Sequence, residues 1–481
     1  MKKTKSLEIN GILNSIRSLI RVAFPLITLP YISRVLHADS LGEYNYASTY
    51  VAYFSYIAAL GITGYSIRSG SELRDNKTAI NRFSSEVFSI NVVTTIISYF
   101  LFFVFIILSN KVQQYKKLVL ILGIGIVFNT ISVEWINSIY EDFLYITLRS
   151  IIIQIVSLIL LFVFVRTPED LYTYAVITVL PTAITGIINW IYVKKYCVIK
   201  YTFSLNLRKH LLSIIIIFLS DFAIFIYVSS DITMLGHYYS DYYVGLYSFS
   251  TKLYSGIKTV LSAIVTVSIP RLSFLYGNGK IDEFRYTVTK IFEAMLTFML
   301  PMVIGMYCVA DNLIKVVGGE EYLPSNTSLK LLCVALVFCE FSYIYTQCIL
   351  MPLHEEKRLM YITLASALVN IGLNLVLIPK MHEIGAAFTT IVAEAFVFLA
   401  SIIVVNKRMR LISPFKSIWK PLTGCVFIVI ACLIIQNLGL NSIKTVVLCV
   451  LISAVLYFSI ELLLKNEFAL SIIKKVVGKE E

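Results

Sequence analysis

The sequence has few charged residues for its length. Asp, Glu, Lys and Arg together make up 15% of the 481 residues, whereas hydrophobic residues make up 58% and the mean hydropathy is +0.81. Soluble domains carry about 25% charged residues, so this composition excludes an ordinary soluble globule. The apolar residues fall in many long runs with short polar connections, which also excludes a single membrane anchor carrying a soluble domain. We therefore expect a polytopic membrane protein.

The sequence also lacks the residue spacings of metal, disulfide and nucleotide sites. Its eight cysteines form no C-x-x-C pair, so neither a zinc site nor a disulfide framework is predicted. Residues 277–280 (GNGK) have neither the spacing of a phosphate-binding loop nor a strand before them. No outer connection is long enough for a catalytic domain, and no acid/base cluster is evident. We expect no enzyme activity, cofactor, metal or nucleotide, and no chemical role for the loop histidines His210, His237, His354 and His382.

The long apolar runs alternate with polar connections along the whole chain. They predict fourteen transmembrane helices, near residues 9–36, 42–65, 84–108, 118–138, 143–165, 171–193, 211–236, 244–269, 290–310, 329–350, 359–379, 384–405, 417–437 and 443–464. Alternate connections hold most of the 41 Lys and Arg residues, so the positive-inside rule predicts that both termini are cytoplasmic. Because these cations are spread over many loops, the net charge of +12 does not indicate a nucleic-acid partner.

The chain repeats itself after six predicted spans. Residues 145–150 read YITLRS and residues 361–366 read YITLAS, and each segment opens the fifth span of its block. Gly42 and Gly245, which are 203 residues apart, each open a second span. An even number of spans per block gives the two halves the same orientation. We expect an all-α fold with two pseudo-symmetric six-helix lobes around a central cleft, at residues 1–200 and 201–412, followed by two additional helices and a tail at residues 413–481.

The first predicted span contains two arginines. Arg17 and Arg21 lie on one helical face with Asn10 and Asn14. A cation within the bilayer is costly unless it faces a bundle interior or a wet cavity, which favours a functional role. The alternative is an amphipathic surface helix over residues 6–21. That alternative leaves only about 15 residues to cross a hydrocarbon core that needs about 20.

The eighth predicted span has a polar stripe with two lysines. The stripe consists of Ser248, Thr251, Lys252, Ser255, Lys258, Thr259, Ser262 and Thr266. The hydroxyl groups alone would be typical of hydrogen bonds between membrane helices, but Lys252 and Lys258 favour a cavity wall. Acidic residues also occur in predicted spans, at Glu86, Glu134, Asp221, Glu340 and Glu394. Each either neutralises a nearby cation or binds a proton or sodium ion.

Several short motifs carry a family resemblance. They are residues 25–36 (PLITLPYISRVL), Leu41-Gly42-x-Tyr44, residues 231–236 (DITMLG), residues 244–248 (VGLYS) with Lys252, residues 270–273 (PRLS), and Gly385-Ala386-Ala387 with Glu394. Together they resemble the polysaccharide flippases of the multidrug, oligosaccharidyl-lipid and polysaccharide exporter superfamily, particularly bacterial O-antigen and capsule flippases. The resemblance implies a two-lobed bundle in the bacterial cytoplasmic (inner) membrane. It also implies that undecaprenyl-pyrophosphate-linked oligosaccharide is moved from the inner to the outer leaflet.

The resemblance also suggests roles for the charged residues. Arg17, Arg21, Lys252 and Lys258 are expected to bind the pyrophosphate from a central cleft, while the polyprenyl tail stays among the membrane lipids. Glu340 and Glu394 are expected either to balance this charge or to couple transport to a proton or sodium ion. Three alternatives remain, namely a multidrug cation antiporter of the same superfamily, a lipid II flippase, and a membrane-bound glycan polymerase or ligase. A cationic cleft is poorly suited to cationic drugs.

Overall fold

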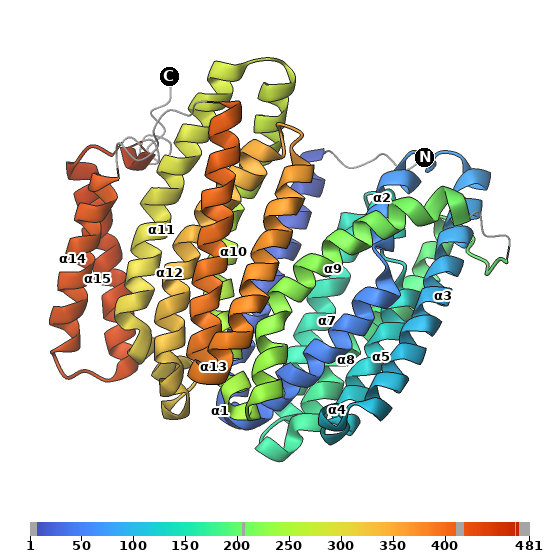
Figure 1. Ribbon diagram of the computed structural model, residues 1–481, viewed down its shortest axis with the longest axis horizontal. Helices are drawn as coiled ribbons and strands as arrows, with labels where there is room; N and C mark the ends of the chain where they lie inside the picture. The colour runs from blue at the N-terminus through green and yellow to red at the C-terminus, as the bar shows by residue number, and fades with distance from the viewer. Residues whose placement is uncertain (1–6, 204–206, 410–417, 467, 471–481) are drawn as a thin grey trace. The chain divides into compact units, whose positions relative to one another are not determined.

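The computed structural model describes residues 7–203, 207–409, 418–466 and 468–470. Within these residues the regular structure is helical and no strand occurs, which confirms the predicted all-α class (Figure 1). The α-helices are α1 (Leu7–Ala59), α2 (Ile62–Ser71), α3 (Lys77–Leu108), α4 (Asn110–Gln114), α5 (Lys116–Ser132), α6 (Trp135–Ile139), α7 (Phe143–Phe164), α8 (Leu171–Tyr192), α9 (Leu207–Tyr238), α10 (Asp241–Gly277), α11 (Ile281–Val317), α12 (Asn326–Tyr343), α13 (Glu356–Arg408), α14 (Trp419–Gln436) and α15 (Ser442–Leu463). Shorter elements are η1 (Pro168–Asp170), η2 (Val193–Lys195), η3 (Glu320–Ser325) and the π-helix η4 (Ile344–Leu350).

The helices account for the predicted membrane spans. In the described part of the chain, eleven helical stretches are long and apolar enough to cross a membrane. One of them, α13, contains two predicted spans, and α1, which lies outside this set, contains the first span and most of the second. Within the described residues, the predicted spans therefore fall on helical stretches, although the second continues from α1 into α2 and the fourth from α5 into α6. The protein is a multi-pass membrane protein.

Two of the predicted connections are reduced to a single non-helical residue. α1 is interrupted at His37 (φ 60°, ψ 174°), and α13 is interrupted at His382 (φ 52°, ψ −133°). A positive φ is uncommon for a residue with a Cβ atom and occurs mostly in tight turns. These two residues therefore separate successive spans without any loop.

The first compact unit covers Met1–Gly245. In it α1 packs against α3, α5, α7 and α9, and α2 packs against α6 and α9. A hydrophobic cluster joins α2, α3, α6 and the first turns of α9 through Ile62, Tyr65, Ile80, Phe83, Val87, Ile90, Val133, Trp135, Ile136, Ile139, Val193, Cys197 and Ile214. α9 thus groups with the first unit, although its residues were expected in the second lobe. The compact units are defined by packing, whereas the lobes were predicted from the internal repeat. The lobe boundaries at residues 200 and 412 therefore remain a prediction.

Two glycines allow a reciprocal close contact within the first unit. A Cβ atom at Gly42 would lie 1.8 Å from the carbonyl oxygen of Asp241, and a Cβ atom at Gly245 would lie 2.0 Å from the carbonyl oxygen of Ala38. The offset of 203 residues relates Ala38 to Asp241 as well as Gly42 to Gly245. The contact of Gly42 with Asp241 is therefore the repeat-related copy of the contact of Gly245 with Ala38. Such a pair of equivalent contacts is expected when two equivalent segments meet across a two-fold axis. This geometry agrees with the internal repeat.

A larger side chain at either glycine is expected to separate these helix ends. We expect Gly42→Leu and Gly245→Leu each to lower the free energy of unfolding by about 3 kcal/mol or more, because a backbone carbonyl cannot rotate away as a side chain can. Thermal unfolding of the detergent-purified protein measures this loss. Gly372→Ala in α13 is the control, since its Cβ atom would meet nothing within 4 Å. Equal unfolding midpoints for all three variants would contradict the close contact.

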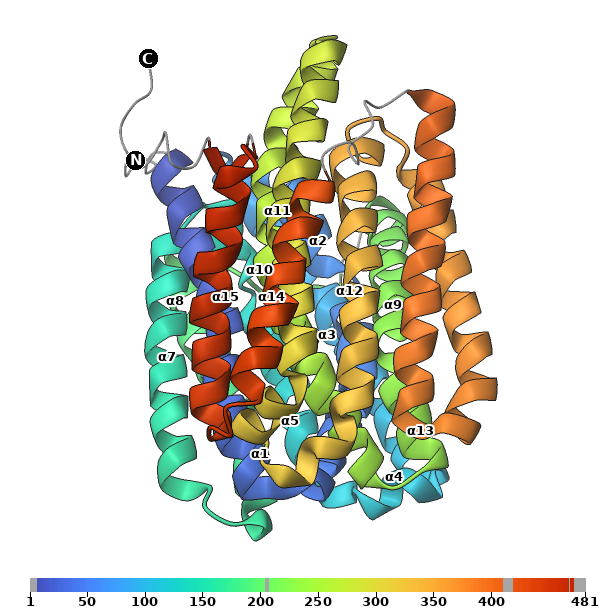
Figure 2. The same cartoon turned by 90° about the vertical axis from the view of Figure 1, so that its left-hand side faces the viewer.

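The second compact unit covers Leu246–Glu481. In it α12 packs against α11 and α13, while α14 and α15 pack against α11 and each other (Figures 1 and 2). Tyr457 of α15 donates a hydrogen bond to the carbonyl oxygen of Thr297 at 2.8 Å, and Gln436 of α14 donates one to that of Cys308 at 2.7 Å. These bonds fix the last two helices on α11.

Candidate functional site

Three of the predicted site residues come together in the second unit. Lys258 lies on α10, Glu340 on α12 and Glu394 in the second half of α13, and the charge of the lysine interacts with both carboxylates. Glu340 is fully buried and Glu394 is 8% exposed. Buried charges in a membrane are rare and costly, so two buried carboxylates beside a half-buried lysine indicate more than a packing role. We call Lys258, Glu340 and Glu394 the charged triad.

Neighbouring residues hold the triad in place. Ser262, one turn after Lys258 on α10, donates a hydrogen bond to Glu340 Oε1 at 3.1 Å. The ammonium of Lys258 lies 5.6 Å from the centre of the Tyr254 ring. Within the described residues, Glu340 Oε2 has no hydrogen-bond partner. The π-helix η4 begins at Ile344, just after Glu340, and such irregular turns are frequent at functional sites.

Lys252, the other lysine predicted for the site, is not part of this group. Lys252 precedes Lys258 on α10, about 9 Å away along the helix axis, and is partly buried. No ion-pair partner of Lys252 occurs among the residues that the structure describes. α1 includes positions 17 and 21, but the side chains of Arg17 and Arg21 lie outside the described part of the chain. Their predicted position in a cleft therefore remains a prediction.

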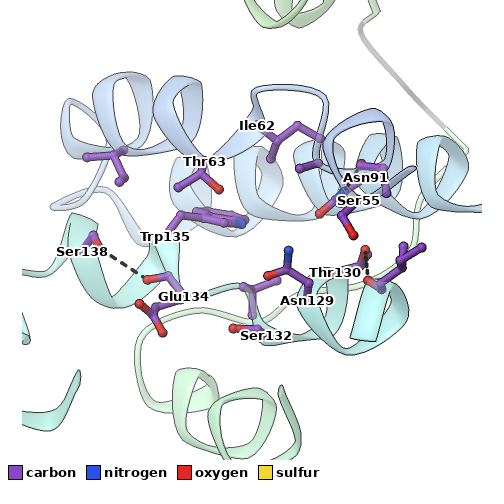
Figure 3. A pocket seen from close by; sticks show the side chains of 15 residues that line it. Ser55, Ile62, Thr63, Asn91, Asn129, Thr130, Ser132, Glu134, Trp135 and Ser138 are labelled. Atoms are coloured by element: carbon purple, nitrogen blue, oxygen red, sulfur yellow. Dashed lines mark hydrogen bonds between the residues drawn. The ribbon is translucent and has the colours of Figure 1, made fainter. Parts of the chain in front are cut away.

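The first unit contains a polar pocket that the sequence did not predict (Figure 3). Its volume is about 290 Å³, and α1, α2, α3, α5 and α6 supply its walls. The lining residues are Ser55, Ala58, Ala59, Ile62, Thr63, Ile67, Asn91, Ile126, Asn129, Thr130, Ser132, Val133, Glu134, Trp135 and Ser138. We call the space that these residues enclose the polar pocket.

Two helix breaks create the polar pocket. α1 stops before Leu60 and Gly61, and α5 stops before Val133, all three of which have left-handed backbone conformations. α2 and α6 then begin immediately after these breaks. Interrupted backbone at membrane depth is tolerated where protein covers it or where it lines a cavity. The breaks thus place backbone and side-chain polar groups around one space.

An ion pair joins Glu134 in the lining of the polar pocket to Arg149 on α7. Arg149 of α7 is 6% exposed, and its Nη2 atom donates a hydrogen bond to Glu134 Oε2. Its Nη1 atom donates a second bond to Asn189 Oδ1 at 2.8 Å, and Asn189 in turn donates to the carbonyl oxygen of Ser132. Charge neutralisation was one of the two roles predicted for Glu134, and the structure provides the partner.

The start of α7, which carries Arg149, is fixed by Asp142. The Asp142 carboxylate accepts hydrogen bonds from the hydroxyls of Tyr192 and Tyr196 and from the ammonium of Lys195, at 2.6, 2.5 and 3.0 Å. Burial raises the pKa of Asp142, but these hydrogen bonds outweigh burial and hold the pKa below its ordinary value. The connection from α6 to α7 is thereby tied to the end of α8.

His210 is a buried link between three helices and does not lie in a loop as expected. Its Nε2 atom lies 2.9 Å from Glu86 Oε2 on α3, and its Nδ1 atom lies 2.6 Å from the hydroxyl of Tyr65 on α2. Arg82 donates a further bond to Glu86 Oε1 at 2.9 Å. The hydrogen bonds tie the first turn of α9 to α2 and α3. The sequence feature that could have indicated this role is the position of His210, an ionisable residue directly before an apolar run.

Replacing His210 should weaken this link. We expect His210→Ala to lower the free energy of unfolding by about 1–3 kcal/mol, because Glu86 and Tyr65 each lose a buried hydrogen bond. Thermal unfolding in detergent measures the effect. His237→Ala, at the opposite end of the same helix, should leave the midpoint unchanged. Unchanged stability of His210→Ala would show that water replaces the imidazole.

An apolar groove lies between α11, α14 and α15 in the second unit. Its volume is about 410 Å³. Most of its lining is hydrophobic, including Phe298, Met302, Met306, Ile428 and Phe458. An apolar groove on a membrane helix bundle suits a hydrocarbon chain.

The chain matches two families in the comparison with known proteins. Residues 9–275 match the polysaccharide biosynthesis protein family, and residues 211–376 match the MatE family. The "Putative O-antigen transporter" of Escherichia coli K12 is 24% identical over 397 residues, which cover 81% of this chain and 94% of that protein. The "Probable multidrug resistance protein NorM" of Bacillus cereus is 24% identical over 230 residues, or 46% of this chain and 50% of that protein.

A solved structure has the same fold. "Lipid II flippase MurJ", in an inward closed conformation, aligns with a TM-score of 0.77 at 17% identity, covering 95% of this chain and 99% of that chain. The polysaccharide-flippase resemblance seen in the motifs is thus confirmed by both sequence families and relatives. Because the match over residues 9–275 includes more than half of the 481 residues, this chain belongs to the polysaccharide biosynthesis protein family.

Proposed function

We propose that this protein is a flippase for undecaprenyl-pyrophosphate-linked oligosaccharide, specifically an O-antigen or capsule repeat unit. It moves this lipid from the cytoplasmic to the outer leaflet of the bacterial inner membrane by alternating access, with both termini in the cytoplasm. The observation that carries the proposal is the match to the Escherichia coli "Putative O-antigen transporter" over 81% of this chain and 94% of that protein.

The physical demands of this substrate agree with the features of the two units. A pyrophosphate and several sugars cannot cross hydrocarbon unaided, whereas a polyprenyl chain need never leave it. The polar pocket and the charged triad offer polar surfaces inside helix bundles. The apolar groove between α11, α14 and α15 offers a place for part of the polyprenyl chain.

The pyrophosphate is assigned to the cationic residues Arg17, Arg21, Lys252 and Lys258. Arginine suits phosphate because its planar group can bind two oxygens at once, while lysine acts as a point charge. Lys252 is the stronger candidate on α10, because the carboxylates of Glu340 and Glu394 offset the charge of Lys258. We assign the two acids, together with Lys258, to coupling with a proton or sodium ion.

Two related transport functions remain as alternatives. A multidrug cation antiporter is supported by the NorM relatives, but these match only about half of either chain. A lipid II flippase is suggested by the name of the MurJ structure, whose 17% identity establishes a shared fold only.

Genetic complementation distinguishes these functions. The gene is expressed in a strain that lacks its own O-antigen flippase but keeps the glycan biosynthesis genes, and surface glycan is measured by immunoblot. We expect surface glycan to return. The same gene is placed in cells depleted of their lipid II flippase, where we expect no rescue of growth. Rescue of growth without surface glycan would overturn the proposal in favour of lipid II, and drug resistance alone would favour the antiporter.

A further inference from the structure

The polar pocket contains hydrogen-bonding groups that the protein itself leaves unused. Among the described residues, the Trp135 indole N–H and the side chains of Thr63 and Asn129 have no hydrogen-bond partner. Trp135 is only 4% exposed, yet its indole lies in the middle of the pocket, between Thr63 of α2 and Asn129 of α5 (Figure 3). In the part of the chain that the structure describes, none of these polar atoms is a fully buried atom without a partner, so each is open to water or to a ligand.

The unused groups do not face lipid. Thr63 and Asn129 are both exposed. Asn129 lies in a stretch long and apolar enough to cross a membrane, and Thr63 lies near the end of the second predicted span, at residues 42–65. An exposed amide in hydrocarbon would have no hydrogen-bond partner at all, which is strongly unfavourable. These side chains must therefore face a space that admits polar molecules.

The charge of the polar pocket selects against anions. Glu134 is the one charged residue in its lining, and its side chain is 27% exposed. The Arg149 side chain that balances Glu134 is only 5% exposed and lies outside the lining. A pyrophosphate or an acidic sugar in the pocket would therefore meet a carboxylate first. A neutral ligand with several hydroxyls could donate to Glu134 and to Asn129 while accepting from Trp135.

The size of the polar pocket limits the ligand to one ring. Its volume of about 290 Å³ is at the lower end of small-molecule sites, which span about 300–1,000 Å³. That space is too small for a whole oligosaccharide repeat unit. We infer that the polar pocket binds one neutral pyranose ring of the transported glycan, with Trp135, Asn129 and Thr63 as its hydrogen-bonding residues. This inference rests on the proposed flippase function for the source of the sugar, but the pocket chemistry would equally recognise a free monosaccharide.

Trp135 offers a direct measurement of binding. The chain has three tryptophans, and Trp190→Phe with Trp419→Phe leaves Trp135 alone. This parent protein, purified in detergent, is titrated with the methyl glycosides of glucose, galactose and N-acetylglucosamine. We expect at least one to change the Trp135 emission saturably, with a dissociation constant on the order of 1 mM, as befits a single sugar ring. Inorganic pyrophosphate should produce no saturable change.

Two variants test the assigned contacts, and one serves as their control. Asn129→Leu and Thr63→Val should each weaken glycoside binding at least about tenfold, the effect of losing roughly one hydrogen bond of 1.4 kcal/mol. Thr423→Val on α14 should change nothing, because the exposed Thr423 hydroxyl bonds only to the carbonyl oxygen of Trp419 in its own helix. No saturable response to any glycoside, equal responses in Asn129→Leu and the parent, or tight binding of pyrophosphate would each overturn the inference.

Flipping assays separate this inference from the proposed function. In vesicles with lipid-linked glycan, Asn129→Leu should raise the substrate concentration for half-maximal flipping and leave the maximal rate nearly unchanged. If the parent flips glycan but shows no glycoside response, the sugar site fails while the flippase function stands. If glycosides bind and no lipid-linked glycan is flipped, the flippase function fails and the pocket takes free monosaccharides.

Discussion

Arg149→Met is expected to remove most of the folded, membrane-inserted protein. Arg149 is almost fully buried and holds Glu134 and Asn189 at once. Removing one partner of a buried ion pair leaves an uncompensated charge and costs about 3–5 kcal/mol, a large part of the stability of most proteins. The quantity to measure is the thermal unfolding midpoint in detergent, together with the amount of inserted protein.

A double variant distinguishes the ion pair from simple packing. Arg149→Met combined with Glu134→Leu removes both charges, and replacing a buried pair by apolar residues is often nearly neutral. We therefore expect the double variant to regain most of the lost stability, although the polar pocket would lose its carboxylate. Arg166→Met is the matched control, because the exposed Arg166 side chain donates only to the backbone carbonyl oxygen of Val163. If the single variant were as stable as the parent protein, the pair would have no structural role.

The sequence predicted the helices well because crossing a bilayer requires a long run of apolar residues. A span needs about 20 apolar residues, and this length is visible in the chain without any knowledge of its neighbours. The same rule could not show that His37 and His382 replace two loops by single residues. A positive φ at a histidine has no sequence signature, since the surrounding helices impose it.

The two candidate sites differ in how far the sequence predicts them. Lys258, Glu340 and Glu394 were identifiable because each is a charge inside an apolar run, although only packing shows that they meet. The polar pocket was not predictable in this way, because it depends on left-handed conformations at Leu60 and Val133, which have no glycine to mark them. Gly61 could have indicated the break between α1 and α2, because glycine readily adopts a left-handed conformation. Arg149, an arginine inside the predicted span at residues 143–165, was a second signal, because a cation in an apolar run calls for an acidic partner.

Glu340→Gln is expected to uncouple transport from its driving ion. The charged triad has two carboxylates for one lysine, so full ionisation would leave an excess negative charge in a buried site. A bound proton or sodium ion would remove that excess, and its release could accompany the conformational change. In vesicles with lipid-linked glycan, the parent protein should flip faster under an imposed proton or sodium gradient. Glu340→Gln should lose this response and flip roughly tenfold more slowly, equivalent to about 1.4 kcal/mol in the barrier.

Lys258→Met separates ion coupling from charge balance. Alone, this variant leaves Glu340 and Glu394 without a nearby cation from α10, and we expect flipping to fall more than in Glu340→Gln. If the triad only balances charge, adding Glu340→Gln to Lys258→Met should restore the parent rate and its gradient response. If the triad couples transport to an ion, the double variant should insert normally but flip without any gradient response. Lys315→Met is the control, because Lys315 pairs with the exposed Glu320 at the end of α11, away from the triad.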